Sequence, residues 1–288
     1  MFVCVHHKND YVIYGAISIF AASASNICNL VNIHKLIYIK PILNYEFTKH
    51  FRPIMIFFAM SCATTIYTNL DTVMLGFMKD NVEVGYYNAA IKIKNVLLGV
   101  VTSLGTVLLP RASYYVENNM YSEFKRIAGK ALNFVVLISF PLCLYFILFA
   151  KEGVLFLSGD AYTEAILPMQ ILMPTLIFIG LTNIMGIQML IPLGREKVVL
   201  YSEIAGAIVD LAINIILIPI MSSSGAAIGT LVAEGVVWMV QYQALKELVK
   251  ESYLKIKYIP IFIGITLAGI LSYFIKFLYL NSFLTLLL

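Results

Sequence analysis

Charged residues are scarce in this sequence. Of its 288 residues, 12% are charged and 60% are apolar, and the mean hydropathy is +0.87. A soluble domain usually carries about 25% charged residues, because its surface must be solvated. The composition therefore excludes an ordinary soluble domain and predicts an all-α integral membrane protein that crosses the bilayer several times.

Cysteine and histidine are also scarce. The four cysteines lie far apart, with no CxxC or Cys/His spacing, and the adjacent His6 and His7 have no further ligands nearby. Zinc and redox sites need such clusters, so we expect no metal and no cofactor. The predicted loops are short and mostly basic, whereas a membrane glycosyl- or acyltransferase needs catalytic carboxylates or histidines in a sizeable loop. We therefore do not expect an enzyme.

Long apolar runs dominate what is present. A helix that crosses a bilayer needs about 20 mostly apolar residues. By this measure the sequence predicts about eight transmembrane helices, at 11–33, 52–76, 84–110, 130–150, 166–192, 198–220, 225–246 and 258–280.

Basic residues alternate along the predicted loops. Most Lys and Arg residues fall in four loops, at 34–52, 111–130, 194–197 and 246–258, while the loops between them are richer in Asp and Glu. Basic residues in short loops mark the cytoplasmic side. The pattern predicts that the N-terminus of this chain lies outside.

Two lysines stand within the third predicted span. Asn88, Lys92, Asn95 and Gly99 share one helix face at three- and four-residue spacing, whereas Lys94 points elsewhere. A charge inside a span needs a partner or water. We interpret Lys92 as facing a water-filled cavity. For Lys94, snorkelling to the interface and a local ion pair both remain open.

Four carboxylates also fall within predicted spans. Glu203, near the inner end of the sixth span, is close enough to the membrane surface to be interfacial. Asp210 shares a helix face with Asn214 in the sixth span, and Glu234 lies in the middle of the seventh. Each is either a charge paired within the bundle or a proton or cation site. Asp71, near the end of the second span, either pairs with Lys92 across a short loop or takes part in ion coupling.

Five stretches together resemble a known family. They are "YTNLDTVMLGF", "VGYYNAAIKI", "TSLGTVLLPRASYY", "GIQMLIPLGREK" and "GAIVDLAINIILIP", in this order within about 50–250. The sequence resembles the polysaccharide transporters, flippases of lipid-linked O-antigen and capsule units. Their superfamily also contains multidrug exporters and the lipid II flippase.

The resemblance implies a MATE-like fold of two six-helix lobes around a central cavity. Residues 51–250 would form the complete second lobe. Residues 1–50 would hold the last helix of an otherwise missing first lobe and a cytoplasmic linker, and 251–288 an additional helix with a truncated tail. The resemblance also implies a place in the bacterial cytoplasmic membrane.

The resemblance further implies a transport mechanism. The cargo would be a polyprenyl-pyrophosphate-linked oligosaccharide, moved among membrane lipids and driven by a cation, H+ or Na+; no nucleic acid is expected. Substrate-binding candidates are Lys92, Lys94, Asn88, Asn95 and Arg111. Candidates for coupling or ion pairing are Asp71, Asp210 and Glu234, although the family favours asparagine at the position of Asp210.

Two alternatives remain open. A cation-coupled multidrug exporter of the same fold would use a carboxylate-lined cavity, which Asp71, Asp210 and Glu234 could form, although lysines there would repel cationic drugs. The chain could also depend on a first lobe supplied by a longer gene product or by a second polypeptide, because half of a rocking transporter lacks the surface against which it moves.

Overall fold

The computed structural model describes residues 47–255 continuously, with isolated positions between 12 and 33 and between 259 and 269. The chain divides into two units, 1–50 and 51–288, and the helices below belong essentially to the second. The spans predicted at 11–33 and 258–280, and the roles predicted for 1–50 and 251–288, fall largely outside the described residues.

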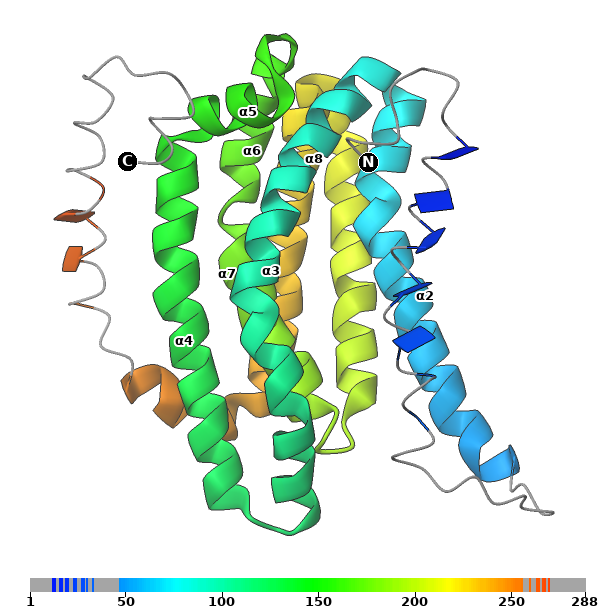
Figure 1. Ribbon diagram of the computed structural model, residues 1–288, viewed down its shortest axis with the longest axis vertical. Coiled ribbons are helices and arrows are strands. Elements are labelled where there is room, and N and C mark those ends of the chain that lie inside the picture. The colour runs from blue at the N-terminus through cyan, green and yellow to red at the C-terminus, as the bar shows by residue number, and fades with distance from the viewer. Residues whose placement is uncertain are drawn as a thin grey trace. The chain divides into compact units, whose positions relative to one another are not determined.

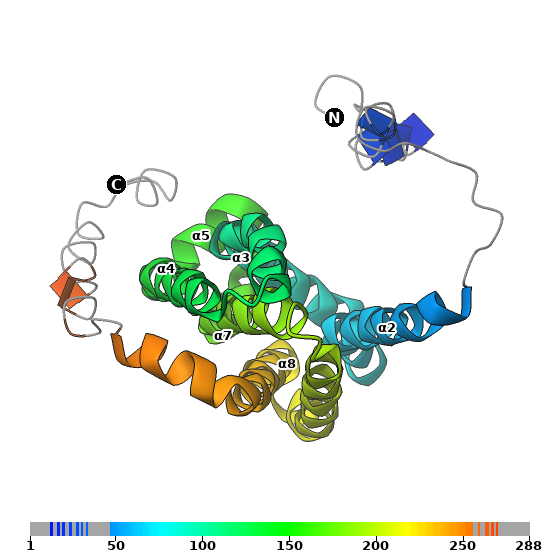
Figure 2. The ribbon, with the colours of Figure 1, turned by 90° about the horizontal axis from the view of Figure 1, so that it is seen from below.

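The described part consists of helices joined by short turns (Figure 1). In chain order they are α2 (Phe47–Met78), α3 (Asn81–Glu117), α4 (Tyr121–Leu148), α5 (Ala150–Ser158), η1 (Asp160–Ala165), α6 (Ile166–Leu172), α7 (Thr175–Thr182), η2 (Asn183–Leu190) and α8 (Glu196–Lys255). Seen along their length, α3, α4, α7 and α8 gather into one bundle (Figure 2).

The helices confirm the predicted membrane fold. Among the described residues, four helices are long and apolar enough to cross a membrane, or five if the bent pair 160–172 and 175–190 is one span. The spans predicted at 52–76, 84–110, 130–150 and 166–192 match these helices. The two spans predicted at 198–220 and 225–246 both lie within α8.

Helix α8 is a hairpin of two helical halves. Its backbone leaves helical geometry at Ser222, with φ 50° and ψ −129°. A Cβ atom added at Gly229 would lie 2.2 Å from the side-chain oxygen of Asn214, and one at Gly206 would lie 2.6 Å from Val237. The two halves therefore run antiparallel in close contact, and small residues permit that approach.

The break in the fifth span has a local cause. Pro174 follows the last residues of α6 and caps α7, and proline cannot donate the backbone hydrogen bond that a continuous helix requires. The axis bends by 49° there. Beyond α7 the chain continues as the π-helix η2, a form that occurs frequently at functional sites.

One predicted loop is mostly helical. The stretch 111–130 was expected to be a cytoplasmic loop, but α3 continues to Glu117, α4 begins at Tyr121, and Asn118–Met120 alone form the turn. Both helices extend past their apolar segments, so Arg111 and Lys125 stand on helix ends. We call this end of the bundle the basic end; the α2–α3 turn and Ser222 lie at the opposite end.

Candidate functional site

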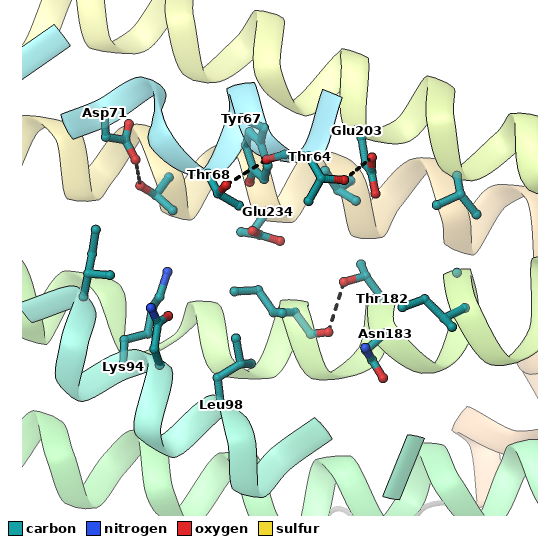
Figure 3. A pocket seen from close by; sticks show the side chains of 18 of the residues that line it. Thr64, Tyr67, Thr68, Asp71, Lys94, Leu98, Thr182, Asn183, Glu203 and Glu234 are labelled. Carbon is teal, nitrogen blue, oxygen red and sulfur yellow. Dashed lines mark hydrogen bonds between the residues drawn. The ribbon is translucent and has the colours of Figure 1, made fainter. Parts of the chain in front are cut away.

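A pocket of about 290 Å³ lies inside the helical bundle. Residues of α2, α3, α7, η2 and both halves of α8 line it (Figure 3). It extends from Asp71, near the end opposite the basic end, to Glu203 on the first half of α8. Its polar lining consists of Thr64, Tyr67, Thr68, Asp71, Tyr87, Lys94, Asn95, Thr182, Asn183, Glu203, Thr230, Glu234 and Gln241.

Asp71 is the most heavily hydrogen-bonded carboxylate of the pocket. Its side chain accepts hydrogen bonds from Asn214 Nδ2 at 2.6 Å, Thr230 Oγ1 at 2.8 Å and the Tyr87 hydroxyl at 2.5 Å. Asp71 is 4% exposed. These donors come from both halves of α8 and from α3, so Asp71 joins three helical segments. The expected ion pair between Asp71 and Lys92 is absent from the described residues.

Next to Asp71 lies a second buried carboxylate with no partner. Both Asp210 carboxylate oxygens and the Asn214 Oδ1 atom are buried without a hydrogen bond. A Cβ atom added at Gly229 would lie 2.9 Å from Asp210 Oδ1, so both oxygens border the space that the glycine leaves open. A buried carboxylate without a partner is strongly unfavourable. Asp210 thus makes no hydrogen bond among the described residues, and its role in ion pairing or coupling stays a prediction.

The remaining carboxylates lie farther along the pocket. Glu234, on the second half of α8, is 8% exposed and stands in the middle. Glu203 accepts a hydrogen bond from Thr64 Oγ1 at 2.8 Å and is half-buried. Carboxylates therefore occur along the whole length of the pocket, from Glu203 to Asp71 (Figure 3).

The two lysines of α3 lie on different sides of that helix. Lys94 lines the pocket and is buried, whereas Lys92 is exposed and does not line it. The expectation that Lys92 is the lysine facing a cavity therefore does not hold within this bundle. The pocket-facing stripe of α3 consists of Tyr87, Ile91, Lys94 and Leu98. Their three- and four-residue spacing is the sequence pattern that indicates a shared helix face for Lys94 and these neighbours.

The other predicted binding residues are spread out. Asn95 lines the pocket, while Asn88 is half-buried and does not. Arg111 is exposed far along α3, where its guanidinium carbon lies 6.0 Å from the centre of the Tyr115 ring. The pocket thus combines Lys94 and Asn95 with Asp71 and Glu234, but leaves out Lys92, Asn88 and Arg111.

Sequence reasoning missed two partners of Asp71. Tyr87 and Thr230 donate to the same Asp71 oxygen, Oδ2, and their own hydroxyl oxygens are 2.8 Å apart. They are distant in sequence and neither is ionisable at neutral pH, so no local pattern connects them to Asp71. Nor do the described residues hold a cluster of three or more His, Cys, Asp or Glu side chains suited to a metal ion.

Comparisons with known proteins support the resemblance seen in the sequence. A family model described as "Polysaccharide biosynthesis protein" matches residues 1–116. An O-antigen transporter of Escherichia coli K12 is 28% identical over 177 residues, covering 62% of this chain and 42% of that protein. One of Shigella dysenteriae is 30% identical over 195 residues, covering 66% and 47%. The chain thus spans less than half the length of these relatives.

A solved structure has a similar fold. The lipid II flippase MurJ, in an inward closed conformation, matches with a TM-score of 0.67 and 16% identity, covering 88% of this chain and 54% of MurJ. At that identity the match concerns the fold. The family model and the sequence relatives support the predicted resemblance to polysaccharide transporters and flippases, and the chain shares the fold of a lipid II flippase.

Proposed function

We propose that this chain forms a lobe of a transporter that moves polyprenyl-pyrophosphate-linked oligosaccharides across the bacterial cytoplasmic membrane. The observation that carries the proposal is the sequence similarity to O-antigen transporters on a bundle with the fold of a lipid II flippase. The chain would act by transport, without covalent chemistry. Use for O-antigen, capsule or another surface polysaccharide is part of the proposal.

The exposed face of α3 suits the charged part of such a cargo. Lys92, Asn95 and Gly99 are exposed, and Asn88 is half-buried on the same side. An ammonium group is a suitable point charge for a pyrophosphate, and amide side chains offer hydrogen bonds to phosphate or sugar oxygens. In a two-lobe transporter this face would border the central cavity, and a first lobe would supply the opposite wall.

The buried acidic pair suits a coupling cation. Asp71 and Asp210 bring two carboxylates together in the membrane, and the Asn214 Oδ1 and Thr230 hydroxyl oxygens are neutral donors beside them. Neutral oxygens cannot take up a proton near neutral pH, but they can bind a metal cation. Broken helices also supply such sites in transporters. Sodium is therefore the cation we propose, with the proton as the alternative.

A cation-coupled multidrug exporter is the second candidate. The observation that favours it is the pocket lining, in which Asp71, Glu203 and Glu234 outnumber the single basic residue Lys94. Susceptibility of an expressing strain to cationic drugs, compared with staining of its surface polysaccharide, separates the two functions. Changed drug susceptibility with unchanged polysaccharide would favour the exporter.

The orientation in the membrane is also a proposal. The basic end, with Arg111 and Lys125, would face the cytoplasm. The variants Asn118→Cys and Lys151→Cys place one thiol at each end of the bundle. A membrane-impermeant maleimide added to intact cells should label Lys151→Cys and spare Asn118→Cys. The reverse labelling would overturn the orientation.

Proteoliposomes test transport and coupling together. The vesicles would hold the chain, a polypeptide that supplies the first lobe, and a polyprenyl-pyrophosphate-linked oligosaccharide. A membrane-impermeant lectin would report exposure of the oligosaccharide on the outer leaflet. We expect exposure to rise under a sodium gradient, to rise less under a proton gradient, and to fall strongly in Asp71→Asn. No exposure under either gradient, with both lobes correctly inserted, would contradict the transport proposal.

A further inference from the structure

The pocket inside the bundle has an unbalanced set of charges. Lys94 is the one basic residue among the described residues that line it, whereas Asp71, Glu203 and Glu234 line it as carboxylates. The buried Asp210 does not line it but interacts electrostatically with Asp71 and Glu234. Acidic side chains grouped in a low-dielectric interior repel one another and lose their hydration. Some positive charge must therefore compensate them in every state of the transport cycle.

Lys94 is placed to provide that charge. It is 9% exposed and interacts electrostatically with Glu234 and, less strongly, with Asp71. Figure 3 shows its side chain extending from α3 toward the side of the pocket where Glu234 and Asp71 lie. Yet it makes no hydrogen bond or ion pair within the described part of the chain. A buried ammonium group without a direct partner points to an interaction that forms in another state.

We propose that Lys94 is a tethered cation that compensates the Asp71–Glu234 side of the pocket when sodium is absent and competes with sodium when it is present. This inference rests on the proposed function, because it assumes that sodium binds beside Asp71 and Asp210. It assigns Lys94 to the coupling machinery, where neither the sequence relatives nor the fold places it.

The chemistry of lysine suits this role. Its ammonium group is a compact charge on a flexible four-carbon stem, so it can move within the pocket while its backbone stays in α3. A tethered group is present at a high effective concentration. Sodium must therefore displace a competitor that is always nearby. When sodium leaves, the Lys94 ammonium group replaces its charge, so the negative charge of the carboxylates remains compensated.

The same charges argue against an anion in this pocket. A pyrophosphate beside Lys94 would also lie near Asp71 and Glu234, and the repulsion from two carboxylates would exceed the attraction of one lysine at similar distances. The exposed Lys92 does not line the pocket in which these carboxylates lie. Of the two lysines expected from the sequence to contact the substrate, Lys92 therefore remains a candidate and Lys94 does not.

The chain contains an intrinsic fluorophore close to the pocket. Trp238 is the single tryptophan in the sequence and follows Glu234 by four residues, about one helical turn, along α8. Its ring stacks on that of Tyr242, with centroids 5.5 Å apart and planes at 22°. Its neighbours Val237 and Gln241 line the pocket. Tryptophan fluorescence of the purified chain should therefore respond to cation binding.

The experiment titrates sodium chloride against choline chloride at constant ionic strength. Tryptophan fluorescence and binding of radioactive sodium are measured in parallel on the detergent-purified chain. In Lys94→Met we expect sodium affinity to rise about tenfold or more, because the competing charge is gone. Lys94→Arg keeps the charge and should stay near wild type. The matched control Lys130→Met removes an exposed lysine of α4 and should leave affinity unchanged.

The outcomes separate the inference from the function on which it rests. If the wild-type chain binds no sodium in either measurement, the sodium site of the proposed function fails, and the inference fails with it. If the wild type binds sodium and Asp71→Asn does not, the site stands. Unchanged or weaker binding in Lys94→Met then overturns the inference alone.

Two further measurements test whether the variant is folded and whether the pocket binds an anion instead. Helical circular dichroism and gel filtration confirm that Lys94→Met is folded; if it is not, Lys94→Gln is used with the same expectation. Sodium pyrophosphate is then compared with sodium chloride at equal sodium concentration. A pyrophosphate-specific fluorescence change that Lys94→Met or Lys94→Gln abolishes would show an anion site and overturn the proposal. An equal response to both salts supports it.

Discussion

The two faces of α3 differ in almost every respect. One face carries Tyr87 and Lys94 into the pocket, where both are buried. The other carries Lys92 and Gly99 on the exposed side, and Asn95 lies at the border between the two faces, exposed but also lining the pocket. Two lysines two residues apart thus meet opposite environments, carboxylates in one case and open surface in the other. We assign coupling to the buried face and cargo to the exposed one, and the following substitutions probe that difference.

The largest effect is expected on the buried face, at Asp71. The variant Asp71→Ala removes the shared acceptor of three buried donors, on Tyr87, Asn214 and Thr230, and leaves a cavity where the carboxylate was; Thr230 keeps its contact with the Ala226 carbonyl oxygen. We expect the free energy of unfolding in detergent to fall by about 3 kcal/mol or more, since each orphaned group is penalised. Asp71→Asn keeps an acceptor oxygen, so its free energy of unfolding should fall clearly less. Equal stability of Asp71→Ala and wild type would contradict the described network.

A smaller loss is expected where α7 packs between α3 and α4. A Cβ atom added at Gly180 would lie 2.6 Å from a Val101 methyl and 2.7 Å from a Val135 methyl. Valine side chains are stiff, so Gly180→Ala should reduce the free energy of unfolding by about 1–3 kcal/mol. The control Gly99→Ala, on the exposed face with nothing within 4 Å, should be neutral or slightly stabilising. An equal loss in both would refute the assigned packing.

The start of α3 should matter less. Asp80 caps this helix by accepting hydrogen bonds from the backbone N–H groups of Val82 and Glu83, both at 2.9 Å. The variant Asp80→Ala should reduce the free energy of unfolding by about 1 kcal/mol, and Asp80→Ser should restore most of it. Chemical denaturation of the three proteins in the same detergent measures both differences. A serine variant as unstable as the alanine variant would argue against capping.

The smallest effect is expected at Lys92. Its side chain is exposed and makes no ion pair or hydrogen bond among the described residues. Lys92→Met should change the free energy of unfolding by less than about 0.5 kcal/mol, as surface substitutions usually do. A loss comparable to that of Gly180→Ala would place Lys92 in the packed interior and remove the contrast between the faces.

The sequence predicted the helices better than the site. Apolar length fixed the spans because a bilayer imposes it, and Pro174 lies at the observed break in the fifth span. The polar stripe through Lys92 is largely exposed on this bundle, and its assignment to a water-filled cavity stays a prediction. In this bundle the pocket face of α3 is largely apolar, with Ile91 and Leu98 beside Lys94.

The network around Asp71 was beyond sequence reasoning for a different reason. Its partners Asn214 and Thr230 lie 143 and 159 residues away along the chain. They meet Asp71 because α8 folds back at Ser222, and no local pattern shows which faces of its two halves then meet α2. The unpartnered state of Asp210 depends on the same arrangement.

The most direct test compares the two lysines in one preparation. Both variants, Lys92→Ala and Lys94→Met, undergo two measurements. Exposure of the lipid-linked oligosaccharide to the lectin is measured in proteoliposomes, and sodium affinity is measured in detergent. We expect Lys92→Ala to lower exposure while sodium affinity stays at the wild-type value, and Lys94→Met to raise sodium affinity about tenfold or more. Full exposure in Lys92→Ala, or unchanged sodium affinity in Lys94→Met, would contradict the division of roles between the faces of α3.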